Sequence, residues 1–120
     1  MVKIMAVDDE PDILNLLKRI LERAGYQFVG CPSGEECLEK YGREKPDLVM
    51  LDIMMPGMDG WRLYKQLMEI NKRQKVAFLT VLGVPAETKE GVIEMGAADY
   101  ITKPFEPAKL LERVKTILKK

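Results

Sequence analysis

The sequence contains no histidine and only two cysteines among its 120 residues. Most zinc sites and Ser/His or Cys/His catalysis are thereby excluded, and the spacing of Cys31 and Cys37 matches no metal-ligand pattern. No apolar run approaches the ~20 residues of a transmembrane helix, and no signal peptide opens the chain. Basic and acidic residues balance at 19 each, which argues against nucleic acid or a membrane as the main partner. We therefore expect a cytoplasmic protein with reduced thiols.

Short apolar runs are the first positive signal in the sequence. Three of them are continuous rather than alternating, at residues 4–7, 48–51 and 76–79. Continuous runs of this length are typical of strands that are buried on both faces of a parallel sheet. Weaker strand candidates cover residues 26–31 and 99–102.

Between these strands, apolar residues recur at helical spacing. The predicted helices cover residues 13–24, 33–41, 61–70, 86–95 and 107–118. Strand and helix alternate five times, which predicts an α/β protein with an open, doubly wound parallel sheet. We expect a single domain over residues 1–120, because domains are most often about 100–150 residues long.

Carboxylates follow two of the predicted strands. Asp8 and Asp9 follow the first strand, and Asp52 follows the third, where an unpaired buried carboxylate would be strongly destabilising. An acid shortly before Pro11 is also a common helix cap, so the first group is ambiguous when taken alone. If the first and third strands are neighbours, the three carboxylates converge and need a cation. Oxygen-only ligation by few side chains favours Mg²⁺.

A hydroxyl and an ammonium group follow the last two strands. Thr80 comes after the fourth strand and Lys103 after the fifth. Each alone is most often structural, but the carboxyl ends of the strands form the ligand-binding edge of a doubly wound sheet. A cation, a carboxylate nucleophile, a hydroxyl donor and an ammonium group together suit the acceptance of a phosphoryl group.

The order and spacing of five motifs resemble the response-regulator receiver domain of two-component signalling, as in chemotaxis regulators. They are VDDEPD at residues 7–12, LDIMMPGMDG at 51–60, Thr80, GAADY at 96–100 and KPF at 103–105. Each motif is weak alone, but the combination is specific and spans essentially the whole chain. The resemblance implies a flavodoxin-like (βα)₅ fold with strand order 2-1-3-4-5.

The resemblance also implies a role for each acid. Asp52 is the expected phosphoacceptor, which takes a phosphoryl group from the phosphohistidine of a partner sensor histidine kinase. Asp9 would bind Mg²⁺ directly, and Asp8 would do so directly or through water. Asp52 and the backbone carbonyl of Met54 would complete the protein ligands, and Mn²⁺ can substitute for Mg²⁺. Such a protein catalyses its own phosphorylation and dephosphorylation but is not a turnover enzyme.

Three further residues carry the expected response to phosphorylation. Thr80 would bind a phosphoryl oxygen, and Lys103 would pair with the phosphoryl group, oriented by a cis peptide before Pro104. Tyr100 resembles the switch aromatic that turns inward as Thr80 moves toward the phosphate. The surface of the fourth helix, fifth strand and fifth helix would then regulate a downstream output protein or a fused output domain.

Three positions near the expected phosphoryl group depart from the family's pattern. Val81 stands where alanine or glycine is usual, and its branched side chain would narrow access to the acyl phosphate. Met54 and Leu82 are apolar where rapidly hydrolysing members often carry polar side chains that place the attacking water. The phosphorylated form is therefore expected to be long-lived.

The expected dimerisation surface is only partly present. Asp99 and Arg113 suit the ion pairs through which many DNA-binding members dimerise. Ala98 and Lys109, however, stand where acidic residues are common. A monomer or a weak, phosphorylation-promoted dimer is the resulting expectation.

Other classes of protein fit the sequence less well. A haloacid-dehalogenase-type phosphatase needs a second acid two residues after its nucleophile, where this chain has Met54. A flavodoxin-like electron carrier needs a hydroxyl- and glycine-rich loop after the first strand, where Asp8 and Asp9 would repel phosphate. A receiver-like interaction module that takes no phosphate remains the alternative, favoured by Val81 and disfavoured by the intact set of site residues.

Overall fold

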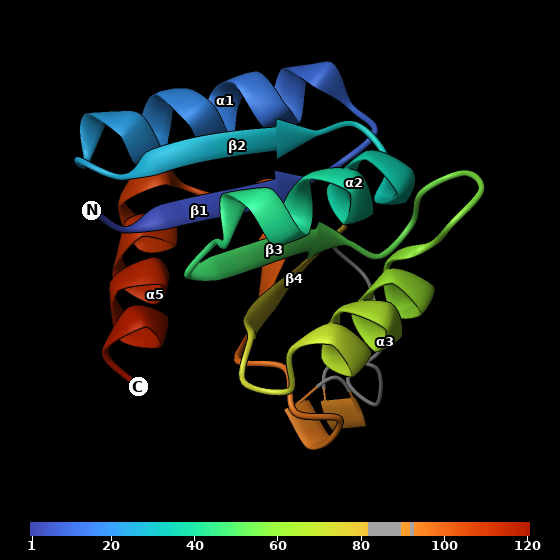
Figure 1. Cartoon of the computed structure of the whole chain (residues 1–120). Coiled ribbons are helices and arrows are strands. Elements are labelled where there is room, and N and C mark those ends of the chain that lie inside the picture. Colours follow the sequence, from blue (N-terminus) through green and yellow to red (C-terminus); the bar gives the residue numbers. More distant parts are fainter. Residues whose placement is uncertain (82–89, 92) are drawn as a thin grey trace.

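The computed structural model describes residues 1–81, 90–91 and 93–120, without the side chains of Thr80 and Val81 (Figure 1). Its strands are β1 (Lys3–Val7), β2 (Gln27–Cys31), β3 (Leu48–Asp52), β4 (Lys75–Val81) and β5 (Asp99–Lys103). They form one parallel sheet in the order β2-β1-β3-β4-β5, which confirms the predicted topology. The strand order reverses between β1 and β3. In such sheets, ligands bind at the carboxyl ends of the strands beside that reversal.

The helices whose bounds the structure describes are α1 (Pro11–Arg23), α2 (Gly34–Glu44), α3 (Gly60–Ile70) and α5 (Pro107–Lys119), which connect and cover the strands. The helix predicted over residues 86–95 falls largely outside the described residues, but residues 90, 91, 93 and 94 are helical. Within the described ranges, no helix is long and apolar enough to span a membrane.

The central strand β3 shows why the apolar runs are continuous. All five of its residues are buried. Leu48 and Met50 belong to the core layer under α1 and α5, whereas Val49 and Leu51 belong to the layer under α2 and α3. Because successive side chains of a strand point to opposite faces, a sheet covered by helices on both faces requires apolar residues at every position.

Helices α2 and α3 begin at residues whose side chains cap the helix. The Ser33 hydroxyl accepts a hydrogen bond from the backbone N–H of Glu36, and the Asp59 carboxylate accepts one from the N–H of Arg62. Such caps satisfy backbone donors that have no partner within the helix. The Asp59 cap also fixes where α3 starts after the loop that leaves β3. Both helices are thereby held at the edge of the sheet where the strands end.

Candidate functional site

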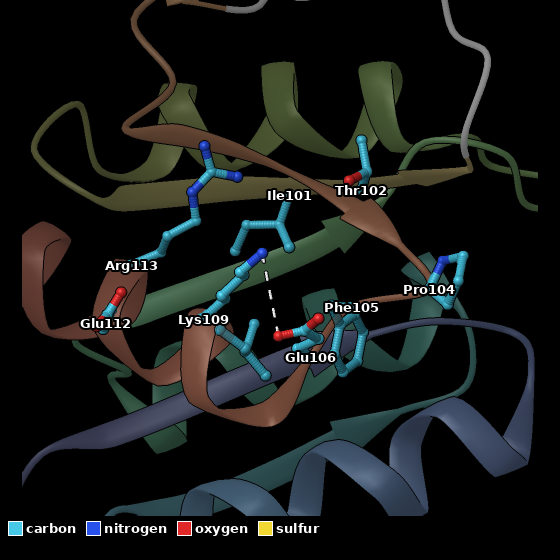
Figure 2. A pocket seen from close by; sticks show the side chains of 9 residues that line it. Ile101, Thr102, Pro104, Phe105, Glu106, Lys109, Glu112 and Arg113 are labelled. Carbon is cyan, nitrogen blue, oxygen red and sulfur yellow. Dashed lines mark ion pairs between the residues drawn. The ribbon is translucent and has the colours of Figure 1, made fainter.

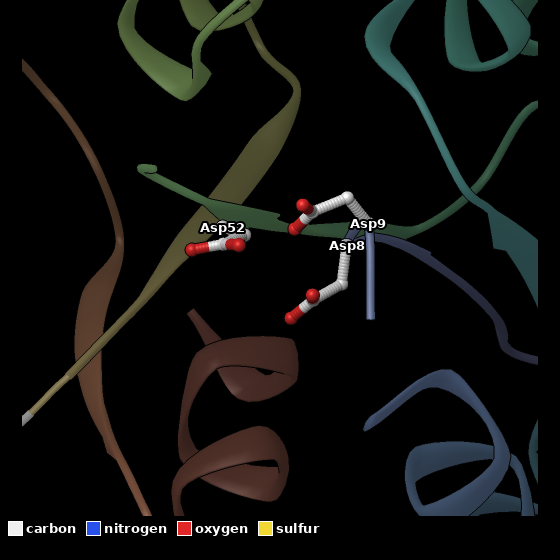
Figure 3. A group of neighbouring side chains, drawn as sticks. All are labelled: Asp8, Asp9 and Asp52. Carbon is white, nitrogen blue, oxygen red and sulfur yellow. The ribbon is translucent and has the colours of Figure 1, made fainter. Parts of the chain in front are cut away.

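Three carboxylates meet at the carboxyl ends of β1 and β3 (Figure 3). Asp8 and Asp9 directly follow β1, and Asp52 is the last residue of β3. One oxygen from each carboxylate lies within 4.8 Å of the others. Asp8 and Asp52 are buried, while Asp9 is exposed to solvent. The convergence expected from neighbouring strands is therefore present.

Lys103 supplies the positive charge at this cluster. It ends β5, and its side chain is buried. Its Nζ lies 3.0 Å from Asp8 Oδ2 and 3.6 Å from Asp52 Oδ2. The peptide bond between Lys103 and Pro104 is cis, as the resemblance implied. One ammonium group thus contacts acids from two other strand ends.

Glu10 is a fourth acid at the site, and its part was not predicted. Its Oε1 lies 3.5 Å from Lys103 Nζ, although its side chain is 62% exposed. The sequence shows Glu10 only as the third member of an acidic run. Because 93 residues separate it from Lys103, no local pattern could have indicated the contact.

Backbone hydrogen bonds hold the two buried carboxylates in place. The N–H of Glu10 donates to Asp8 Oδ1 at 2.9 Å, and the N–H of Met54 donates to Asp52 Oδ1 at 3.2 Å. The N–H of Asp8 in turn donates to the carbonyl oxygen of Cys31 at the end of β2. Each carboxylate therefore keeps a second oxygen directed toward Lys103, with its own orientation fixed by the main chain.

Burial and negative charge raise the pKa of Asp52. Desolvation contributes most and the charge of Asp8 next, whereas Lys103 and the Met54 N–H oppose them; the resulting pKa is about 6. Burial by itself lowers the pKa of Lys103, but its hydrogen bond to Asp8 and the charges of Asp8, Asp52 and Glu10 outweigh that effect and raise it. The cluster is short of positive charge, which is the electrostatic condition for binding a cation.

The loop after Asp52 approaches the phosphoacceptor candidate closely. Gly57 has a positive φ of 78°, which side chains rarely adopt. At Gly60 a Cβ would collide with the backbone oxygen of Asp52, so only glycine allows α3 to start this close to β3. The loop keeps Met54 71% exposed beside the carboxylates. A hollow of about 510 Å³ lies there, lined by Ile53, Met54, Met55, Pro56, Asp59 and Trp61.

The structure places the remaining predicted residues on β4 and β5. The backbone of Thr80 pairs with Thr102, one residue before Lys103, but its side chain, that of Val81 and all of Leu82 lie outside the described residues. Tyr100 is buried in the core layer under α2 and α3. It lies next to Phe78 in the sheet register. The roles of Thr80 and Tyr100 in switching stay predictions.

The surface of β5 and α5 contains a second hollow, of about 490 Å³ (Figure 2). Arg113 crosses from α5 to β5, where it pairs with Asp99 at 3.5 Å and donates a hydrogen bond to the carbonyl of Tyr100. Lys109 Nζ lies 4.0 Å from Oε2 of Glu106, the residue that precedes α5. Asp99 and Arg113, which the sequence suggested as suited to the ion pairs of a dimer, are paired with each other within one chain.

Comparison with known proteins identifies the family. Residues 4–115 match the model of the response regulator receiver domain. The alkaline phosphatase synthesis transcriptional regulatory protein PhoP of Bacillus subtilis (strain 168) is 45% identical over 121 residues, covering 98% of this chain and 49% of that protein. The chemotaxis protein CheY of Thermotoga maritima is 36% identical over 118 residues and is covered over 98% of its length, as is this chain.

Solved structures agree with the sequence matches. The BeF3-activated N-terminal receiver domain of RstA from Klebsiella pneumoniae superposes with a TM-score of 0.88 at 37% identity, covering 98% of this chain and 99% of that one. The chain spans about half the length of the transcriptional regulators that it matches, such as PhoP, and nearly all of the Thermotoga CheY. This chain belongs to the family of response regulator receiver domains.

Proposed function

We propose that this chain is a single receiver domain, over residues 1–120, that acts as a phosphoacceptor switch in the cytoplasm. Asp52 takes a phosphoryl group from the phosphohistidine of a sensor histidine kinase. The observation that carries the proposal is a buried carboxylate at a strand end, with two acids and a buried lysine directed at it. Such an arrangement is unfavourable for stability alone, which points to a chemical task.

The acid cluster fits a divalent cation of the Mg²⁺ type. Its donors are hard carboxylate oxygens that lie close enough to share one ion. Asp8, Asp9 and Asp52, with the backbone carbonyl of Met54, would hold Mg²⁺, or Mn²⁺ in its place. When bound, the ion neutralises charge on the phosphoryl oxygens.

The residues of the chain perform the transfer itself. An oxygen of Asp52 forms the new bond to phosphorus as the bond from phosphorus to the histidine nitrogen breaks, and the released imidazole takes up a proton. Lys103 pairs with a phosphoryl oxygen, and the Met54 N–H and the Thr80 hydroxyl donate hydrogen bonds to others. Because the pKa of Asp52 is about 6, the nucleophile is mostly ionised near neutral pH.

Phosphorylation would then bias a two-state element. Thr80 moves toward the phosphoryl group, and Tyr100, which is already buried in this structure, is held in that inward position, which changes the surface of the fourth helix, β5 and α5. That surface regulates a downstream output protein or a fused output domain, with the chain as a monomer or a weak, phosphorylation-promoted dimer. Receiver domains are signalling modules, so the transfer occurs once per activation rather than as turnover.

The test is phosphorylation by acetyl phosphate, followed by intact mass spectrometry with and without Mg²⁺. We expect one phosphoryl adduct that requires Mg²⁺ and is absent from Asp52→Asn. Asp12→Asn is the matched control, because Asp12 is an exposed acid in the first turn of α1 and outside the cluster. No adduct with either acetyl phosphate or a phosphorylated kinase, with Mg²⁺ bound, would favour the phosphorylation-independent interaction module.

The decay of the adduct tests the expected lifetime. Val81, Met54 and Leu82 offer no polar side chain to place an attacking water, so the acyl phosphate should persist. Loss of the phosphoryl group within seconds from the isolated chain would contradict this expectation.

A further inference from the structure

Glu10 extends its side chain to the site lysine rather than to the helix that it precedes. It is the N-cap residue of α1, with extended backbone angles (φ −94°, ψ 111°), yet its side chain caps no backbone N–H. Its carboxylate instead lies 3.5 Å from Lys103 Nζ. Glutamate is not among the preferred N-cap residues, so it is the contact with the site lysine that makes this side chain a candidate for a role in the site.

The backbone of Glu10 is bonded to the same cluster that its carboxylate contacts. Its own N–H donates to Asp8 Oδ1 at 2.9 Å, and the same Asp8 binds Lys103 through Oδ2 at 3.0 Å. Asp8, Glu10 and Lys103 therefore form a closed set of contacts. Lys103 has three N–H donors, and three carboxylates surround it: those of Asp8, Asp52 and Glu10.

Of these three acids, Glu10 loses least when Lys103 moves. Asp8 and Asp52 are buried and would be left without a counter-charge, whereas the side chain of Glu10 is 62% exposed and is readily solvated. A phosphoryl group arriving at Asp52 needs an N–H of Lys103. The phosphoryl group therefore competes with Glu10 for the ammonium group of Lys103.

We propose that Glu10 is a positioning residue that holds Lys103 before phosphorylation and weakens the binding of phosphoryl donors by competing for its ammonium group. This inference rests on the proposed function of Asp52. It predicts that releasing Lys103 from Glu10 strengthens donor binding, while the transfer step, in which the contact is already broken, is little changed.

Three variants separate the contact from the charge. Glu10→Gln removes the charge and weakens the bond to Lys103. Glu10→Asp keeps the charge, but its shorter side chain is a preferred N-cap that turns back to the N–H groups of α1 and leaves Lys103. Asp12→Asn removes one exposed negative charge two residues away without touching Lys103. If the contact with Lys103 weakens donor binding, only Glu10→Gln and Glu10→Asp should strengthen it.

The experiment measures the initial rate of phosphoryl adduct formation at a series of acetyl phosphate concentrations in saturating Mg²⁺. In this reaction the Asp52–phosphorus bond forms as the bond from phosphorus to the acetate oxygen breaks. For Glu10→Gln and Glu10→Asp, we expect the half-saturating concentration to fall about two- to fivefold, the scale of a partly exposed ion pair. The maximal rate should change by less than about twofold, and Asp12→Asn should match the native chain.

Three other outcomes are possible, and each contradicts either the role of Glu10 or the proposed function. If the native chain forms an adduct and Glu10→Gln matches it, Glu10 does not restrain Lys103. If Glu10→Gln and Asp12→Asn shift equally while Glu10→Asp does not, the effect is charge repulsion and the contact is not its cause. If the native chain forms no adduct with any donor, the proposed function itself fails.

Discussion

The two ends of the same sheet bury polar groups in opposite ways. At the carboxyl ends of the strands, Asp8, Asp52 and Lys103 are buried as charges, with more acids than cations. At the amino ends, Gln74 is buried as a neutral amide. Its Oε1 accepts a hydrogen bond from the Tyr41 hydroxyl at 2.5 Å, and its Nε2 donates to the carbonyl of Lys75. A neutral, fully paired network stabilises the fold. An unbalanced charged network destabilises it, and a ligand that supplies the missing charge recovers that free energy on binding.

The largest effect should follow removal of the Lys103 ammonium group from the carboxyl end of the sheet. Lys103→Met leaves Asp8 and Asp52 buried without a counter-charge, so the free energy of unfolding without Mg²⁺ should fall by roughly 3 kcal/mol. Chemical denaturation measures this, and added Mg²⁺ should restore part of the loss. Lys115→Met, at an exposed position of α5, is the matched control and should change stability little. Equal losses in both variants would contradict the stated imbalance of charge.

Asp52 should show the reverse sign. Its pKa is raised in the folded state from 3.8 to about 6, so the fold favours the protonated form. The stability that Asp52 contributes is therefore greatest below its unfolded pKa and is lost as the pH rises through its folded pKa. Asp52→Asn should therefore stabilise the protein without Mg²⁺ near neutral pH, by at most about 3 kcal/mol.

Unfolding free energies of the native chain and Asp52→Asn, measured without Mg²⁺ from about pH 4 to about pH 7, check this sign. The gain of the variant should vanish toward the acidic limit. A constant difference across the range would show that the titration of Asp52 is not its source.

At the neutral end, loss of one hydroxyl should cost less. Tyr41→Phe leaves the buried Gln74 carbonyl without its donor, so the free energy of unfolding should fall by about 1–2 kcal/mol, independently of Mg²⁺. Denaturation with and without Mg²⁺ measures both properties. Tyr26→Phe removes the same group at a half-buried position outside the network. A Mg²⁺-dependent loss in Tyr41→Phe would mean that the two ends of the sheet are coupled.

The smallest effect should come from the cap of α1. Glu10→Asp places a preferred N-cap residue where the native side chain makes no capping bond, so the protein should gain about 0.5–1 kcal/mol. Thermal unfolding of this variant beside Glu10→Gln measures the gain. A destabilised Glu10→Asp would show that the contact with Lys103 contributes more than a cap.

The sequence predicted well whatever depends on local pattern and sheet geometry. The run at residues 48–51 became β3 because a fully buried strand must be apolar throughout, and the acids converged because parallel strands end at one edge. β4 begins at Lys75, one residue before the predicted run, because Lys75 still pairs with Leu48.

What the sequence did not indicate depends on contacts between distant side chains. An exposed glutamate has many rotamers, so nothing at Glu10 showed that it would reach Lys103. The link from Tyr41 to Gln74 likewise joins α2 to the turn before β4. Such contacts are set by packing of the whole domain, which no local spacing encodes.

The reach of Lys103 has a consequence for how far a chemical event travels. The lysine belongs to β5, the outermost strand, yet its ammonium group passes the neighbouring β4 and meets acids from β3 and β1 at the middle of the sheet. A new charge on Asp52 therefore acts on the edge strand through one side chain, with no relay through β4. Although β5 lies two strands away from β3, the contact between Lys103 and Asp52 links the end of the central strand directly to the surface beside β5.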